Sequence, residues 1–510
     1  PTEALMMTGG DLRLNVENDH LLNMYGCRPF PRPEAFSFAS STATSISNSA
    51  FDQTQKQREK LIKETFLLGL EKAYKKNKAN LIDRLKQGFK FRKSASIIIS
   101  PSGTDISLLF AGICQTVYGD KLTHILVASD ETGSGVPMAL AGKHFADTSA
   151  LNIPVKKEAL IEGFKEVGVH KIPLRDASGK LKSKQKMDDE VDVLIRDAFA
   201  NGLKPILHVM DQSKLGYAAP SQSYLDFIKK KYNDKVLVLV DNSQLRMDQT
   251  RIEEYLKKGF MLTITGSKFY TGPPFSGALV VSSKIAEKLT TVQNKLPIGF
   301  KEYYLKSEFI DNTALSEVLA EGYNIGSYLR WYAALTEIER YNEVPVTLRK
   351  LGIELFCEHV ANRIENSPCL VSLEARSNTG DLPLPEEHRT IFPFFILKEN
   401  KVLSHPEADR LYRLLNMDIT SLANFENDEE KRIAKQMCHI GQPVKVLYNH
   451  QEPSAVLRIS LGARIISESW ENNDVSLYFK KIEDQLNQVD IIMNKIGLIL
   501  KHAEALKVSS

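Results

Sequence analysis

The sequence lacks the features that define several classes of protein. Its 510 residues include only five cysteines, an odd number, and no two of them form a CxxC pair. That pattern favours free thiols in a reducing compartment and provides no zinc site. Lys and Arg number 66 against 63 Asp and Glu, so the strong basic excess of a dedicated nucleic-acid-binding protein is missing.

Long apolar runs are missing as well. No stretch approaches the roughly 18 uninterrupted apolar residues that a membrane-spanning helix needs. The first residues, Pro1 to Met7, do not show the basic and then apolar order of a signal peptide. We therefore expect a cytoplasmic protein with no nucleic-acid partner, no membrane partner and no metal site.

The amino-terminal part has little regular patterning. Pro29, Pro31 and Pro33 interrupt the first 50 residues, and residues 40–49 form a Ser/Thr-rich loop. Apolar residues then recur among many lysines, which predicts one amphipathic surface helix from Gln53 to about Leu85.

Strands and helices alternate from residue 94 to about 300. The expected strands are 96–99, 125–127, 169–173, 205–210, 236–240, 261–265 and 277–281, and the expected helices are 106–117, 136–145 and 188–200. Alternation of this kind indicates βαβ units and a mainly parallel sheet that is covered on both faces. The fold class is therefore α/β.

The last third of the chain predicts a second, smaller α+β domain. Helices are expected between 313 and 366, strands near 390–397, 444–447 and 456–461, and a long helix from 475 to about 507. We divide the chain into an N-terminal arm and helix (1–93), a large domain (94–340) and a C-terminal small domain (341–510).

Three polar features follow strands of the parallel block. The segment 101–105 (Pro-Ser-Gly-Thr-Asp) opens a helix, where backbone N–H groups can bind a phosphate or simply be capped. Asp241 ends the most apolar strand, where a buried carboxylate needs a cation or a strong donor, unless it caps the next helix. Lys268 follows another strand in a Ser/Gly/Pro frame, and a partly buried lysine can lose its proton and act as a nucleophile.

This ordered set resembles fold-type-I pyridoxal-phosphate (PLP) enzymes, and most closely the class-V aminotransferase and cysteine desulfurase superfamily. Asp241 and Gln244 match the Asp-x-x-Gln motif of that family. Ser267-Lys268, Gly272-Pro273 and Gly277 match its Ser-x-His-Lys-x-x-Gly-Pro-x-Gly-x-Gly motif, with one extra residue between Lys and Gly. The resemblance covers residues 94–300 well and 320–470 loosely.

The resemblance implies the PLP-dependent transferase-like fold of aspartate aminotransferase, in which the large domain has a mostly parallel seven-stranded sheet. Lys268 would be the catalytic residue and would carry PLP as a Schiff base. Asp241 would hold the pyridine nitrogen protonated, and Gln244 would hydrogen-bond the phenolic oxygen. The other expected cofactor-binding residues are Gly103, Thr104, Thr132, Ser213, Thr265 and Ser267. Asp211 is an alternative to Ser213.

A further match lies near the C-terminus. Residues 457–461 (Leu-Arg-Ile-Ser-Leu) resemble the family's Arg-x-Ser-Leu strand, whose arginine binds the substrate carboxylate. The guanidinium fork suits that role because it pairs with a carboxylate through two hydrogen bonds. Arg458 is therefore the expected substrate-binding residue; a structural ion pair is the alternative, and Arg464 is a nearby competitor.

The chain departs from the family at three places in its motifs. Tyr323 follows Gly322 where the family usually has a threonine that reaches the phosphate from the partner subunit. Thr132 stands where the family often places a histidine over the cofactor ring, in a Glu-His pair. Cys438 lies four residues before Gln442, two residues away from the register of the catalytic desulfurase cysteine. His439, beside it, is either a general acid/base or a satisfied loop residue.

The resemblance implies a homodimeric PLP-dependent enzyme that acts on a free amino acid, and transamination is the leading expectation. The alternative is a lyase or a β/γ-replacement enzyme, including desulfurase-like chemistry. A PLP-free interaction protein on the same scaffold is a further alternative. The motifs do not name the substrate, because geometry decides which bond reacts on the cofactor.

Overall fold

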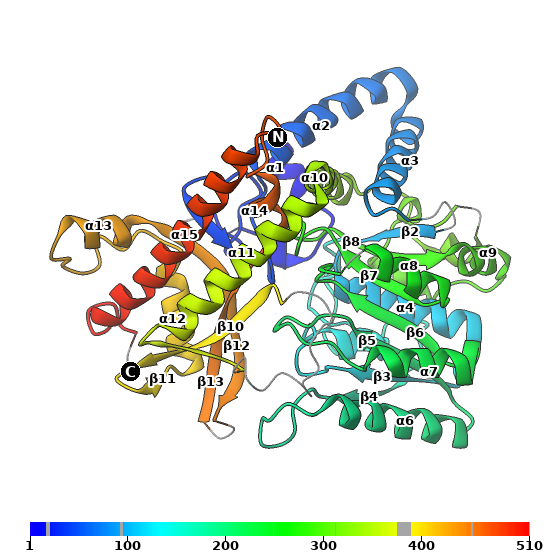
Figure 1. Ribbon diagram of the computed structural model, residues 1–510. Helices are drawn as coiled ribbons and strands as arrows, with labels where there is room; N and C mark the ends of the chain where they lie inside the picture. Colours follow the sequence, from blue (N-terminus) through cyan, green and yellow to red (C-terminus); the bar gives the residue numbers. More distant parts are fainter. Residues whose placement is uncertain are drawn as a thin grey trace.

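Two sheets organise the computed structural model, which describes residues 1–16, 21–91, 95–247, 249–311, 313–374, 389–449 and 452–508. Within these residues, one sheet has seven strands in the order β2-β8-β7-β6-β5-β3-β4. The other has six, in the order β1-β12-β13-β10-β11 with β9 paired to β10. The sheets belong to two parts that lie side by side in Figure 1. The expected α/β fold, with a seven-stranded sheet and a second mixed part, is confirmed.

The seven-stranded sheet is mostly parallel, as predicted. Its strands are β2 (Ala95–Ser100), β3 (Leu122–Val127), β4 (Gly168–Ile172), β5 (Lys204–Met210), β6 (Leu237–Asn242), β7 (Met261–Thr265) and β8 (Gly277–Ser282). Only β8 runs antiparallel to its neighbours, β2 and β7. The apolar run 237–240 of β6 is buried, as expected for a strand covered on both faces.

Helices cover both faces of this sheet. Ile125 and Val127 of β3 belong to one buried cluster and Leu126 to another, because successive side chains of a strand point to opposite faces. The first cluster includes residues of α6 (Lys184–Ala200), α7 (Gln222–Tyr232) and α8 (Gln249–Lys257). The second includes residues of α4 (Gly103–Tyr118), α5 (Val136–Leu140) and α9 (Ser283–Thr291).

The second part combines the mixed sheet with several helices, among them α15, the longest of the described helices. Its strands are β1 (Ala35–Phe38), β9 (Leu370–Ser372), β10 (Ile391–Lys398), β11 (Lys401–Val402), β12 (Met437–Tyr448) and β13 (Glu452–Ser460). Its helices are α10 (Ile325–Glu343), α11 (Val346–Glu365), α12 (His405–Leu415), α13 (Asp428–Lys435), α14 (Ala463–Ser467) and α15 (Val475–Lys501). The expected C-terminal helix is α15, whose apolar side chains at Ile482, Val489 and Ile492 are buried.

Short helical turns complete the chain. They are α1 (Thr2–Met6), η1 (Leu12–Leu14), η2 (Asn233–Lys235), η3 (Ile298–Glu302), η4 (Lys306–Glu308) and η5 (Ala314–Val318). None of the described helices combines the length and the apolar character needed to cross a lipid bilayer.

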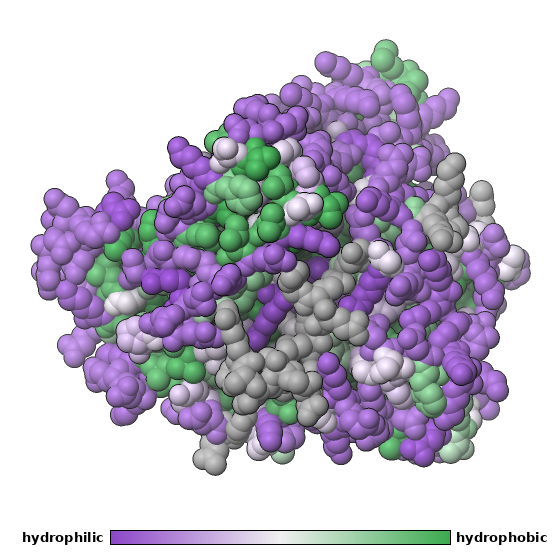
Figure 2. Space-filling view, viewed as in Figure 1, coloured by the Kyte–Doolittle hydropathy of each residue, from purple (hydrophilic) through white to green (hydrophobic). Residues whose placement is uncertain are grey.

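The prediction of a single helix between Gln53 and Leu85 is wrong, because the chain forms two helices in this range. Two helices, α2 (Asn48–Leu68) and α3 (Leu70–Gly88), form a hairpin that projects from the body in Figure 1. Gly69 joins them with a φ of +82°, a conformation that glycine adopts without a steric penalty. Phe66 and Leu67 at the turn are 87% and 81% exposed, and Figure 2 shows apolar residues there.

The N-terminal segment is built into the second part of the fold. β1 pairs in parallel with β12, and α2 and α3 pack on α10. The buried Arg330 of α10 donates hydrogen bonds to the carbonyl oxygens of Met6 (2.6 Å), Thr8 (2.6 Å) and Gly9 (2.7 Å). The domain boundaries placed after residues 93 and 340 stay predictions.

The Arg330 contacts predict a large effect of Arg330→Met on stability. The variant leaves these three carbonyl oxygens, and that of Phe275, which accepts from Arg330 Nε at 2.8 Å, without their charged donor. We therefore expect the free energy of unfolding to fall by about 3 kcal/mol. Urea denaturation measures the change. Arg196→Met on the exposed surface of α6 is the control and should change stability by less than about 0.5 kcal/mol. Equal effects of the two substitutions would show that Arg330 does not anchor the segment.

Candidate functional site

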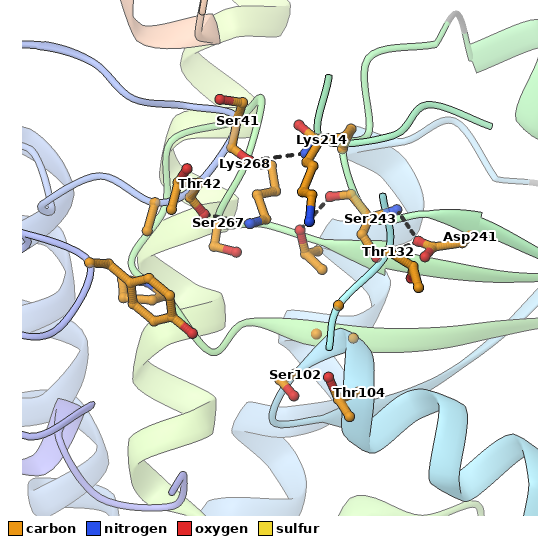
Figure 3. Close-up of a pocket in the computed structure, with 18 of the residues that line it drawn as sticks. Ser41, Thr42, Ser102, Thr104, Thr132, Lys214, Asp241, Ser243, Ser267 and Lys268 are labelled. Carbon is orange, nitrogen blue, oxygen red and sulfur yellow. Dashed lines mark hydrogen bonds between the residues drawn. The ribbon is translucent and has the colours of Figure 1, made fainter. Parts of the chain in front are cut away.

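A polar cavity of 390 Å³ lies where the parallel strands of the large sheet end. Loops that follow β2, β3, β5, β6 and β7 form one side, and the segment 41–43 and Arg458 of β13 close it. Ligands of parallel sheets bind at this edge. All predicted site residues except Ser213 line this cavity, and Figure 3 shows several of them pointing into one space.

The start of helix α4 forms one end of the cavity. The hydroxyl of Ser102 caps the helix by accepting a hydrogen bond from the N–H of Asp105 at 3.3 Å. Gly103 and Thr104 make the first turn, whose N–H groups have no partners within the helix. A Cβ on Gly277 would lie 3.0 Å from the carbonyl oxygen of Ser100, so glycine permits β8 to approach this turn. The turn is suited to an anion such as a phosphate.

Asp241 ends β6 and lines the same cavity. Its Oδ1 accepts hydrogen bonds from the N–H (3.0 Å) and the hydroxyl (2.6 Å) of Ser243. Burial raises the pKa of Asp241, and the two bonds from Ser243 and the nearby Lys268 oppose that rise. The second oxygen, Oδ2, accepts no hydrogen bond from the described residues, so it is available to a cationic donor in the cavity.

Lys268 lies in the turn that follows β7. Its Nζ donates a hydrogen bond to the carbonyl oxygen of Thr42 at 2.5 Å. Burial, followed by the positive charges of Arg458 and Arg246, lowers the pKa of Lys268 to about 7. The amine is therefore neutral in a large fraction of molecules near pH 7, as a nucleophile or a base requires.

Close packing against α10 fixes this turn. A Cβ on Gly266 would clash with Ala334, and one on Gly272 would lie 2.7 Å from the Ala334 Cβ. The N–H of Gly272 donates to the carbonyl oxygen of Gly266 at 2.9 Å. The two glycines thus hold Lys268 against a helix. Ser267 and Thr265 also line the cavity, and the Thr265 hydroxyl donates to the Ser243 carbonyl oxygen at 2.7 Å.

Gln244 ties the turn after β6 to the N-terminal segment. Its amide nitrogen donates to the carbonyl oxygen of Ser41 at 3.0 Å. Its amide oxygen accepts from Arg246 at 3.2 Å. Arg246 also donates to the carbonyl oxygen of Leu461 at 2.6 Å and to the hydroxyl of Ser40 at 2.9 Å. This network holds segment 40–42 against the cavity.

Arg458 is 3% exposed and has no carboxylate partner among the described residues. It donates to the carbonyl oxygens of Lys214 (3.0 Å) and Gln442 (2.7 Å) and to the hydroxyl of Thr42 (2.9 Å). Its Nε has no hydrogen-bond partner. Burial lowers the pKa of Arg458 to about 10, so the group stays charged and can bind an anion in the cavity.

Arg464, the competing arginine, is engaged elsewhere. It forms an ion pair with the buried Glu337 at 3.2 Å and donates to the carbonyl oxygens of Ser45 and Thr271. It lines a second cavity of 290 Å³ rather than the one that holds Lys268. The structural ion pair weighed for Arg458 is therefore found at Arg464.

Ser213 does not line the cavity, in contrast to its expected role. Its hydroxyl donates to the buried Glu131 at 2.5 Å and accepts from the N–H groups of Leu215 and Tyr217. Asp211, the alternative, is also outside the lining, and its N–H donates to the carbonyl oxygen of Asp241. Ser213 thus shapes its loop, whereas Thr132 does line the cavity.

Cys438 and His439 lie on β12 outside this cavity. The Cys438 thiol donates to the Gln436 carbonyl oxygen, and burial raises its pKa to about 12. His439 donates through Nε2 to the carbonyl oxygen of Tyr25 at 2.9 Å, and burial lowers its pKa to about 4. Neither side chain is placed for chemistry beside Lys268.

Several lining residues escaped the sequence analysis. Ser41 and Thr42 were expected only as a Ser/Thr-rich loop, and Arg13 and Lys214 were not identified. Arg13 pairs with Asp11 at 2.7 Å, and its guanidinium lies 4.7 Å from the centroid of the Phe275 ring. No short motif marks these residues, because they enter the site through chain folding over long sequence distances.

The buried amine of Lys268 predicts a pH-dependent gain in stability for Lys268→Met. In the ligand-free protein its pKa is about 7, against 10.5 when unperturbed. Folding therefore costs free energy at every pH below 10.5, and the cost reaches its full size below pH 7. We expect Lys268→Met to raise the free energy of unfolding by about 2 kcal/mol at pH 6.5, with a smaller gain at pH 9.5.

Urea denaturation of the ligand-free protein at the two pH values tests this expectation. Lys56→Met is the control, because Lys56 is exposed on α2 and its loss should have no pH-dependent effect. A gain for Lys268→Met that is the same at both pH values would contradict the lowered pKa.

Comparisons with known proteins identify the fold. No family model and no curated protein sequence matches the chain. Among solved structures, the phosphoserine aminotransferase SerC from Cytophaga hutchinsonii matches 90% of this chain and 99% of its own, with a TM-score of 0.50 and 11% identity. A C-DES variant with glycine covalently linked to its PLP cofactor matches 89% of this chain and 97% of its own, with a TM-score of 0.50 and 12% identity. The chain therefore has the fold of fold-type-I PLP-dependent enzymes.

Proposed function

We propose that the protein is a PLP-dependent enzyme that acts on an amino acid, and that it is an aminotransferase. One observation carries the proposal. A buried lysine with a lowered pKa, a strand-end aspartate, a helix start and an unpaired arginine all line one cavity. Each of these groups has a counterpart among the functional groups of PLP and an α-amino acid.

The residues present fit the cofactor. The start of α4 offers N–H groups to a phosphate, and glycine at 103 and 277 leaves this turn open where a Cβ would crowd Ser243 or Ser100. The free Oδ2 of Asp241 suits a protonated ring nitrogen, which would compensate the buried carboxylate. Thr104 and Ser267 would hold the phosphate, and Gln244 would meet the phenolic oxygen.

When bound, PLP supplies an electron sink for charge that develops at the α-carbon of the amino acid. Asp241 would keep a proton on the ring nitrogen through its negative charge. Lys268 would hold the cofactor through its aldehyde, and the Lys268 amine would also be the group that moves a proton to and from the α-carbon of the substrate. A pKa of about 7 suits that work near neutral pH.

Arg458 would bind the α-carboxylate of the substrate. Its guanidinium is buried, has a free Nε and meets only neutral acceptors among the described residues. A carboxylate would supply the missing negative charge and accept two hydrogen bonds from the fork. The contacts from Lys214, Gln442 and Thr42 fix the fork before substrate enters.

A lyase or a β/γ-replacement enzyme is the alternative reaction class, and the same residues serve it. Desulfurase-like persulfide chemistry has less support, because no cysteine of the described residues lines the cavity. The proposal also includes a homodimer, as the resemblance implies, and a cytoplasmic location, as the cysteine pattern suggests. A PLP-free interaction protein is the further alternative, but it would not need a buried lysine with a lowered pKa.

Borohydride reduction of the PLP-treated protein tests the proposal. We expect the pyridoxyl group on Lys268 alone, as read by peptide mapping. Lys268→Ala should lose the label and lower kcat by about 100-fold or more, because the proton-transfer group is gone. Asp241→Asn should keep the label at Lys268 and still lower kcat. Labelling of another lysine, or of none, would contradict the proposal. A separate assay for keto-acid formation from an amino acid would distinguish transamination from elimination.

Substrate binding tests the role of Arg458. Arg458→Met should raise KM for the amino acid by about 10- to 100-fold, because a charge-assisted contact is lost, and should leave PLP content unchanged. Arg464→Met is the matched comparison: it breaks the pair with Glu337 and should lower thermal stability more than it alters KM. If Arg464→Met raised KM more than Arg458→Met did, the residue that binds the α-carboxylate would be Arg464 instead.

A further inference from the structure

Lys214 is a lysine in the cavity that the proposed function leaves unused. It lies in the loop after β5, and Figure 3 shows its side chain reaching into the cavity that also holds Lys268. The loop is fixed by hydrogen bonds from Ser213 N–H to the Tyr217 carbonyl oxygen (2.7 Å) and from Tyr217 N–H to the Ser213 hydroxyl (3.0 Å). Lys214 is therefore presented on a rigid turn.

The ammonium group of Lys214 forms no hydrogen bond or ion pair with any other described residue. Burial and then the charge of Arg458 lower its pKa, whereas Glu131 and Asp130 raise it. Of these two carboxylates, Glu131 lines the cavity, but it is already engaged by other residues. It accepts a hydrogen bond from the Ser213 hydroxyl at 2.5 Å and lies 3.7 Å from the Arg175 guanidinium. Lys214 is thus a half-buried cation without a close counter-charge.

Lys214 and Arg458 are neighbours. Arg458 Nη1 donates to the carbonyl oxygen of Lys214 at 3.0 Å, and the Arg458 charge is close enough to the Lys214 side chain to lower its pKa. Two cations held together in a partly buried cavity repel each other unless an anion lies between or beside them. The pair therefore favours a ligand with more than one negative charge.

The other cations of the cavity are already assigned. Arg13 pairs with Asp11 at 2.7 Å. Lys268 would be attached to the cofactor, and Arg458 would meet the α-carboxylate. Lys214 is the remaining cation in the described lining, and a substrate with a neutral side chain would leave it desolvated and unpaired.

We propose that Lys214 selects substrates whose side chain carries a carboxylate or a phosphate, with Arg458 binding the α-carboxylate and Lys214 the distal anion. This inference rests on the proposed function. The physical basis is that an unpaired buried charge is costly, so Lys214 disfavours neutral side chains while it stabilises anionic ones. Lys214 is thus a specificity-determining residue of the cavity.

Ligands that cannot react provide the first test. Calorimetry of the PLP-loaded protein would compare butyrate, with one carboxylate, against succinate and glutarate, with two. We expect the dicarboxylates to bind at least about tenfold more tightly than butyrate. Lys214→Met, which keeps length and removes charge, should abolish that preference, and Lys214→Arg should retain part of it. Lys56→Met on exposed α2 is the control for loss of one positive charge.

Turnover provides the second test. Aspartate, glutamate and O-phosphoserine would be compared with alanine, so that carboxylate and phosphate side chains are distinguished. Lys214→Met should lower kcat/KM for the preferred anionic substrate by at least about tenfold and should not lower it for alanine, whose neutral side chain makes no charge contact with Lys214. PLP content and labelling at Lys268 should also stay unchanged in the variant.

Three results would overturn the inference. An equal loss for alanine and the anionic substrates would place Lys214 at the α-carboxylate. Loss of PLP from Lys214→Met would make it a cofactor-binding residue, and no effect on any ligand would give it no role. Failure of the proposed function appears separately, as absence of a pyridoxyl group on Lys268. In that case the inference is tested by comparing dicarboxylate binding with butyrate binding in the PLP-free protein and in its Lys214→Met variant. A preference for dicarboxylates that the variant loses would support the role of Lys214, and an equal preference in both proteins would contradict it.

Discussion

The parallel register of the large sheet is the constraint on which the site depends. Met210 of β5 lies opposite Asp241 of β6, and Asp241 lies opposite Thr263 of β7. All three strands therefore end at one edge, and the residues that follow each one meet there. β8 is antiparallel to both β7 and β2, so β2 points the same way as β7 and delivers the start of α4 to that edge. A slip of one residue between β6 and β7 would turn Asp241 away from the cavity.

The N-terminal segment completes what the sheet begins. Thr42 accepts from Lys268 through its carbonyl oxygen and from Arg458 through its hydroxyl, so one residue links the two proposed working cations. β1 joins this segment to the mixed sheet, while Arg330 holds the chain before it. The cavity is thus closed by backbone oxygens, which hold cations in place without neutralising them. That arrangement leaves positive charge for an anionic ligand.

Short-range signals were sufficient for the elements that build one side of the cavity. The apolar run ending at Asp241 and the Ser/Gly/Pro frame of Lys268 are contiguous in sequence, so their positions at strand ends could be predicted. The seven-stranded sheet followed from alternation of strands and helices and from the family resemblance. The break at Gly69 was not predictable from periodicity, because apolar residues continue from Phe66 through Leu70 across the turn.

Contacts between distant segments account for what the sequence did not provide. Ser213 appeared as a polar residue at a strand end, but its hydroxyl serves its own loop and Glu131 instead of the cavity. Lys214, its neighbour, reaches the cavity, and nothing in the local sequence distinguishes the two. Arg458 lies within the Leu-Arg-Ile-Ser-Leu motif and Arg464 follows it closely, and only the position of Glu337 on α10 shows which of them is already paired. The choice between equivalent side chains is therefore made by counter-charges that lie far away in the sequence.

The charges of the cavity also bear on the class of reaction. A persulfide-forming enzyme needs a reactive thiol near the substrate, and the Cys438 thiol has a raised pKa and lies on β12, outside the lining. A thiol in that state is a weak nucleophile. The groups that do face the cavity include cations and hydroxyls, which bind and orient anions and move protons, together with the carboxylate of Asp241. Such a set suits proton transfer at the α-carbon of an anionic amino acid better than attack by sulfur, and this is the physical ground for placing transamination ahead of desulfuration.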